Sequence, residues 1–302
     1  MKYKMMLCLC LIWLGIVNGK AQSCCATGSG CNYSVLPDLN KHMAGLRWTY
    51  SQYENRNFSL IPEQNGVKNH EMVNTLEAFA RFNLPKRFQL SVFVPVTFIH
   101  QYSTLSDTHD RGLGDMSVLA QYQILDPKKF GVGRVKHQLR AGVGVKLPTG
   151  KYKTGKNDLY NTSVQLGSGS TDVLLSMIYS LSYRKLVMNA RASYKLNTVN
   201  RYGFRFGDKA ETGVRFSYVA KAGKITLMPM IGASYIYTQN NYNHHQPVYE
   251  SYAHLLTANA GMEAYVKHFA FSVSVTPVVY NRVFTMAYRQ LVSTEVGAFY
   301  LF

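Results

Sequence analysis

Alternating apolar and polar residues recur from about residue 44 to residue 302, in stretches long enough to cross a bilayer as tilted β-strands. In the stretch at 186–197, Leu186, Met188 and Ala190 lie on one face, whereas Asn189 and Arg191 lie on the other. We place twelve candidate strands at 44–52, 73–85, 88–101, 113–125, 137–148, 170–183, 186–197, 209–220, 225–239, 253–266, 269–281 and 289–302. Such a pattern predicts a large antiparallel β-domain.

The connectors between these strands alternate in length. After even-numbered strands they are mostly tight, as at Lys86-Arg87, Arg184-Lys185, 221–224 and Lys267-His268, with a longer one at 126–136. After odd-numbered strands they are mostly long and polar, as at 53–72, 102–112, 149–169 and 240–252. Short turns on one side and long loops on the other are typical of a transmembrane β-barrel with periplasmic turns. An even strand count puts both ends of the barrel on that side.

Alternation alone does not separate this barrel from a soluble sandwich, in which the apolar face points inward. The last strand, 289–302, bears on the choice because it ends on Phe302 and would leave an unpaired, adhesive edge in a soluble fold. In a closed barrel that strand pairs with the first one. We therefore predict an all-β, antiparallel transmembrane barrel of about twelve strands, with apolar side chains toward lipid and polar ones toward the lumen.

The N-terminus has the plan of a secretory signal peptide. Lys2 and Lys4 precede the apolar run 5–17, and small residues lead to a cleavage position after Ala21. The run is short for a membrane-spanning anchor helix. We expect a signal peptide at 1–21, a cysteine-containing segment at 22–43 that plugs the barrel or lies in the periplasm, and the barrel at 44–302. The expected location is the outer membrane of a Gram-negative cell.

The formal net charge of +17 would suggest nucleic acid in a cytoplasmic protein. An exported chain meets anionic lipids first, and much of the excess positive charge lies in the short connectors. We therefore expect outer-membrane lipids, not nucleic acid, as partners. We also expect the assembly machinery to recognise the terminal strand that ends in Phe302.

Charged residues at lumen positions make a nearly neutral ladder. The basic members are Arg47, Arg81, Arg140, Lys146, Arg191, Lys195 and Arg215. The acidic members are Glu77, Asp115, Asp172, Glu211, Glu263 and Glu295. Two interpretations stay open: the charges fill a narrow bore with salt bridges, or they line a water-filled channel.

The most distinctive motifs lie between residues 112 and 172. Gly112-Leu113-Gly114-Asp115 precedes one strand, Leu147-Pro148-Thr149-Gly150 ends another, and 166–172 (LGSGSTD) opens the next. Together these motifs resemble the outer-membrane barrel family named for the meta-cleavage pathway of phenol degradation. The resemblance covers roughly 44–302 and implies a transporter barrel for hydrophobic or aromatic small molecules. Asp115 and Asp172 would pair with Arg or Lys across the bore, or form an acidic selectivity feature.

Cys24, Cys25 and Cys31 cluster after the expected signal, where the family resemblance implies a plain segment. They admit a disulfide with one free thiol, a soft-metal site for Cu(I) or zinc, lipidation of Cys24, or no role.

The leading expectation is a passive channel for small solutes, hydrophobic or aromatic ones included, with no catalysis and no cofactor. One alternative is a metal-handling barrel that uses the cysteine cluster. Another is a lipase-like outer-membrane enzyme, for which His100, Ser103, Asp107 and His109 are the residues to consider.

Overall fold

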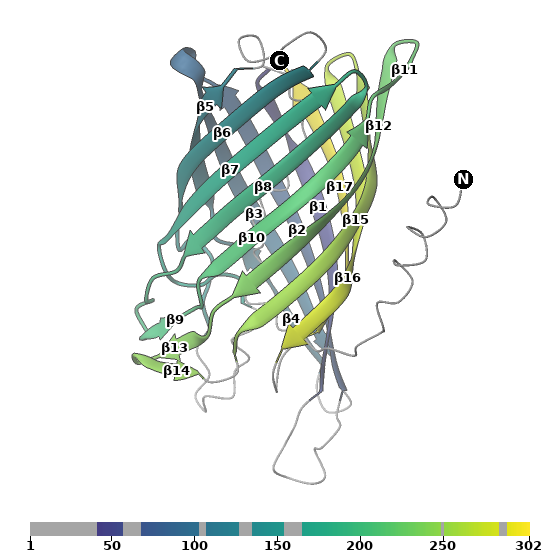
Figure 1. Cartoon of the computed structure of the whole chain (residues 1–302). Coiled ribbons are helices and arrows are strands. Elements are labelled where there is room, and N and C mark those ends of the chain that lie inside the picture. The colour runs from purple at the N-terminus through teal and green to yellow at the C-terminus, as the bar shows by residue number, and fades with distance from the viewer. Residues whose placement is uncertain are drawn as a thin grey trace, which may run out of the picture.

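The protein forms a closed barrel of 12 antiparallel strands, which confirms the predicted fold class (Figure 1). The computed structural model describes residues 41–56, 68–102, 107–126, 135–153, 165–248, 251–283 and 289–302. The expected signal peptide and Cys24, Cys25 and Cys31 lie outside these ranges. Within the described ranges, no helix has the length and apolar character needed to span a bilayer.

The wall strands follow the predicted order closely. They are β1 (Met43–Arg56), β2 (Lys68–Asn83), β3 (Phe88–Tyr102), β5 (Ser117–Leu125), β6 (Val135–Lys146), β7 (Asp172–Tyr183), β8 (Leu186–Leu196), β10 (Lys209–Tyr218), β12 (Ile225–Thr238), β15 (Ala253–Val266), β16 (Phe269–Val283) and β17 (Arg289–Leu301). Shorter elements are η2 (Pro85–Arg87), β4 (Asp107–Leu113), β9 (Phe204–Arg205), β11 (Ala220–Ala222), β13 (Asn241–Asn243) and β14 (Gln246–Val248). Strands β9, β13 and β14 form a small separate sheet beside the barrel mouth.

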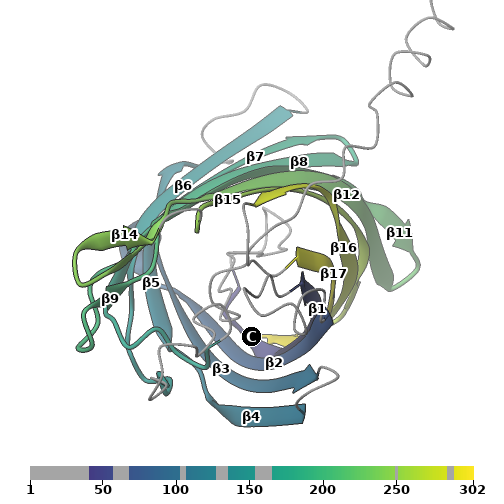
Figure 2. The ribbon, with the colours of Figure 1, turned by 90° about the horizontal axis from the view of Figure 1, so that it is seen from below.

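Closure occurs between the first and last strands. Along β1 and β17, the paired residues run from Met43 with Leu301 to Glu54 with Arg289. On the other side of the barrel the ring continues through the β10–β12 pair, as the view along the axis shows (Figure 2). The terminal strand is therefore paired on both sides, which satisfies its backbone groups as a membrane requires.

The two faces of the wall have the predicted inverse polarity. Outward apolar side chains are exposed, for example Ile231 at 66% and Phe269 at 51%. Inward charged side chains are buried, for example Arg47 at 6% and Lys146 at 2%. The tight turns lie at the same end as Phe302, and Lys86, Arg184 and Lys267 take the positive φ angles that such turns require.

A charge on the outward face tests this orientation energetically. Ile231 lies midway along β12, whereas Ile225 begins the same strand at the short-turn end. We expect Ile231→Arg to cost about 2–4 kcal/mol of folding free energy and Ile225→Arg about 0–1 kcal/mol, because the cost depends on depth in the bilayer. Reversible urea unfolding in lipid vesicles measures both. Equal costs at the two positions would contradict the assignment of this face to lipid.

The candidate site lies beside a break in the pairing of the wall strands. β3 pairs with β4 at one end and with β5 at the other, and residues 114–116 separate those two strands. Pro95 lies opposite this gap; its carbonyl accepts a hydrogen bond from the Gly114 N–H at 2.8 Å, but a proline has no N–H to return. The hydrogen bonding between the strands is therefore interrupted at this point, and Asp115 can face the outer loops.

Candidate functional site

An apolar patch covers the lumen wall at the short-turn end. It contains Met43, Phe79, Phe93, Leu119, Ala270 and Leu301, with Tyr265 and Phe299 packed against them, and we call it the apolar lumen cluster. Its members come from neighbouring strands, from β5 round through β1 to β15. The ring of Phe79 stacks on that of Phe93 at a centroid distance of 5.1 Å. The inner face is thus not uniformly polar.

A glycine on the neighbouring strand β1 and another on β17 itself make room for Phe299. A Cβ atom on Gly45 would lie 2.7 Å from Cδ1 of Phe299, and one on Gly297 would lie 2.7 Å from Cζ of the same ring. The ring therefore lies flat over two glycine positions and meets Phe79 edge-on, at 6.1 Å between centroids. Side chains at either glycine would push Phe299 out of the cluster.

A belt of paired charges lies next to the apolar lumen cluster, on the loop side. Arg47 is hydrogen-bonded to Glu77 on the adjacent strand and lies 3.8 Å from Glu295. Further along the wall, Arg191 and Glu211 lie 2.6 Å apart. The remaining pair is Arg215 with Glu263, at 3.9 Å.

These pairs mostly join neighbouring strands, so they lie along the wall and do not bridge the bore. Each acidic residue of the predicted ladder is within ion-pair distance of a basic one. Of the other basic members, Arg81 lies over the Phe79 ring and Arg140 contacts Gln89. Lys195 lies opposite Lys209 in the backbone pairing of β8 with β10. The ion pairs of the ladder therefore mostly follow the wall from strand to strand.

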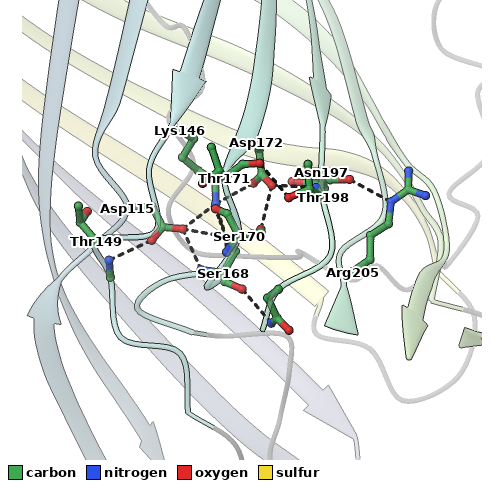
Figure 3. Close-up of polar contacts among 12 residues, drawn as sticks. Asp115, Lys146, Thr149, Ser168, Ser170, Thr171, Asp172, Asn197, Thr198 and Arg205 are labelled. Carbon is green, nitrogen blue, oxygen red and sulfur yellow. Dashed lines mark hydrogen bonds and ion pairs between the residues drawn. The ribbon is translucent and has the colours of Figure 1, made fainter. Parts of the chain in front are cut away.

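The sequence motifs between residues 112 and 172 meet at one point near the outer mouth (Figure 3). The carboxylate of Asp115 accepts hydrogen bonds from the backbone N–H groups of Gly150 at 3.0 Å and Ser168 at 2.8 Å. Thr149 replaces the missing strand pairing, because its hydroxyl accepts from the Met116 N–H and donates to the Gly114 carbonyl, both at 2.8 Å. The motifs are therefore one structural unit that fastens the loop to the wall.

Gly150 and Gly167 allow this close approach. A Cβ atom on Gly150 would lie 2.7 Å from the Cα atom of Gly167, and one on Gly167 would lie 2.5 Å from Oδ1 of Asp115. The backbones are in direct contact, so no other residue type fits without displacing the loop.

Lys146, the last residue of β6, forms the ionic centre of this unit. Its Nζ lies 2.6 Å from Oδ2 of Asp115 and 2.7 Å from Oδ2 of Asp172, and it also bonds the hydroxyl of Ser168. All three charged side chains are at most 2% exposed. The predicted basic partner is therefore present, but it lies on the strand between the two aspartates; the expectation of pairing across the bore is wrong.

The network continues into the outer loops. Oδ1 of Asp172 accepts from the Ser170 hydroxyl at 2.8 Å and from the Thr198 N–H at 3.0 Å. Beyond it, Arg205 is ion-paired with Asp208 at 2.9 Å. The unit thus connects the wall to the segment that carries the small sheet of β9, β13 and β14.

Comparison with known families identifies the chain. The family described as "Putative MetA-pathway of phenol degradation" matches residues 73–254, which is more than half of the sequence. The chain belongs to this family. The matched region contains the whole Asp115–Lys146–Asp172 unit. A comparison with curated protein sequences finds no match.

One solved structure in particular has the same fold. An outer membrane channel from Pseudomonas putida F1 matches with a TM-score of 0.65 at 14% identity, over 90% of this chain and 98% of that one. Weaker matches include the β-domain of a Bordetella autotransporter, with TM-score 0.48, 14% identity and coverage of 86% and 100%. The CymD monoaromatic hydrocarbon channel matches with TM-score 0.40, 8% identity and coverage of 87% and 88%. This member of the phenol-degradation family therefore has the fold of an outer-membrane β-barrel.

Sequence reasoning missed the apolar lumen cluster. Phe79 lies between Glu77 and Arg81 at alternate positions, so its inward direction could have been read from the strand period. Of the residues considered for a hydrolase, His100, Asp107 and His109 do come together, at the outer face of the β3–β4 hairpin, and Ser103 lies outside the described residues.

Proposed function

We propose that this protein is a passive outer-membrane channel for small hydrophobic solutes, aromatic ones included. The observation that carries the proposal is the apolar lumen cluster, which offers an apolar solute a surface inside a bore that is largely lined by polar and charged side chains. An apolar lining of this kind also opposes the passage of water and ions. Each acidic side chain of the charge belt is paired with a basic one, so the belt does not offer a free carboxylate to a cation.

The family supports the solute class, because its description refers to phenol degradation. The matched structure from Pseudomonas putida F1 supports the activity, because it is described as an outer membrane channel. No covalent step is part of the proposal. The charge ladder and the apolar lumen cluster would act as wall surfaces and not as reacting groups.

We further propose that the barrel lies in the outer membrane with its short turns toward the periplasm. Basic turn residues such as Lys86, Arg184 and Lys267 would then contact anionic phospholipid headgroups. β17, which closes the barrel against β1, would be the segment that the assembly machinery recognises.

Uptake of a labelled monoaromatic hydrocarbon by Gram-negative cells that express the protein tests the function. Phe93 is 2% exposed within the apolar lumen cluster. Leucine and asparagine are both shorter than phenylalanine and have similar shapes, but leucine is apolar and asparagine is polar. We expect Phe93→Leu to keep most of the uptake and Phe93→Asn to reduce it about tenfold, the factor that about 1.4 kcal/mol of added barrier produces.

Outer-membrane levels of both variants are compared by the heat-dependent gel shift of a folded barrel. If cells with wild-type protein take up the hydrocarbon no faster than cells without it, the proposed channel activity is wrong.

A further inference from the structure

The β3–β4 hairpin projects from the barrel on the side of the long loops (Figures 1 and 2). Among the strands that the structure describes, β4 pairs with β3 alone and is not part of the closed ring. Its residues at the far end are exposed, with Asp107 and His109 showing side-chain exposures of 65% and 70%. This surface belongs neither to the lumen nor to the Asp115–Lys146–Asp172 unit.

The strand register places three side chains of types that can ligate a metal on one face of the hairpin. His100 and His109 are direct cross-strand partners, and Asp107 lies two residues before His109 on the same face. The two imidazole rings stack at a centroid distance of 4.1 Å and an angle of 16°. Oδ1 of Asp107 lies 2.8 Å from Nε2 of His100 and 3.4 Å from Nε2 of His109.

The three side chains are near enough to one another to share one metal ion. One ligand atom from each of the three residues lies within 4.8 Å of the other two. Around a tetrahedral ion with bonds of 2.0–2.1 Å, two ligating nitrogens are about 3.4 Å apart. The two rings would have to rotate out of their stacked arrangement to point one nitrogen each at a common ion. The Asp107 carboxylate already lies close to one nitrogen of each ring, so a bound ion would take the place of the direct contact between Asp107 and His100.

The ligand chemistry selects the ion. Imidazole nitrogens with one carboxylate suit Zn²⁺, Ni²⁺ and Cu²⁺, whereas Ca²⁺ and Mg²⁺ prefer oxygen ligands. We propose that His100, Asp107 and His109 form a surface site for a borderline divalent transition-metal ion. A bound ion would link the two strands of the hairpin beyond the ring and stabilise their pairing.

Calorimetric titration of ZnCl₂ into the full-length, chelator-treated protein in detergent tests the site. We expect binding to persist in the Cys24→Ser/Cys25→Ser/Cys31→Ser variant and to weaken at least about tenfold in His100→Gln/His109→Gln. His244→Gln/His245→Gln is the matched control, since it removes an exposed histidine pair from another loop and should leave binding unchanged. Excess Mg²⁺ should not compete.

Cobalt(II) absorption gives a second readout, because imidazole ligation changes the visible spectrum of the ion. That change should be present in the triple serine variant and absent in His100→Gln/His109→Gln, whose folding is checked by the gel shift. Zinc binding that is lost with the cysteines, or that is unchanged in His100→Gln/His109→Gln, would overturn the proposal.

Discussion

Replacing Lys146 by methionine is expected to destabilise the barrel by about 3–5 kcal/mol, the usual cost of removing one partner from a buried ion pair. The variant leaves Asp115 and Asp172 as two buried carboxylates without their shared cation. Denaturant unfolding in detergent or lipid measures the loss. Lys153→Met is the matched control: Lys153 pairs with Asp110 at 2.9 Å but is 35% exposed, so about 0–1 kcal/mol is expected.

A compensated variant separates charge from packing. Lys146→Met combined with Asp115→Asn and Asp172→Asn removes the uncompensated charge and should recover part of the stability. If the single and the triple variants are equally unstable, the electrostatic explanation of this unit is incorrect, and packing alone accounts for its importance.

The second large effect concerns water and small polar solutes. We expect the double variant Phe79→Ala/Phe93→Ala to raise the swelling rate of proteoliposomes in small sugars by about tenfold, since removing about 1.4 kcal/mol of barrier is enough for that factor. The physical reason is the loss of the stacked pair from the apolar lumen cluster, whose surface excludes water.

An outward phenylalanine provides the control for this experiment. Phe271 is 48% exposed on the lipid face of β16, the strand that also carries Ala270 of the apolar lumen cluster. Phe271→Ala should leave the swelling rate at the wild-type value. Equal permeability of the wild type and the Phe79→Ala/Phe93→Ala variant would show that the cluster does not limit passage.

Much of the fold could be predicted from the sequence, because a barrel leaves a local signal in every strand. The period of two and the alternation of short and long connectors set the strands to within a few residues, including β8 (Leu186–Leu196) and β15 (Ala253–Val266). The interruption before β5 was less visible. It depends on Pro95, which lies on a different strand and acts only through the pairing.

The candidate site was harder to predict because its contacts depend on which strands are neighbours. The sequence predicts that Asp115 and Asp172 face the lumen, but their relation to Lys146 follows from the order β5, β6 and β7. Likewise, the meeting of His100 and His109 requires the β3–β4 register, which the sequence does not show. The local sequence indicates which residues face the lumen, but it does not indicate which residues from other strands they contact.

Contact between β12 and lipid is the most direct test of the claim that the apolar face of the barrel wall meets the membrane. Single cysteines at Met228, Met230, Ile231 and Ala233, introduced into the Cys24→Ser/Cys25→Ser/Cys31→Ser protein, would carry an environment-sensitive fluorophore in lipid vesicles. A quencher dissolved in the acyl chains should act on labels at 231 and 233, and much less on those at 228 and 230. Equal quenching at all four positions, or quenching of 231 and 233 by a water-soluble agent alone, would contradict a wall whose apolar face meets lipid.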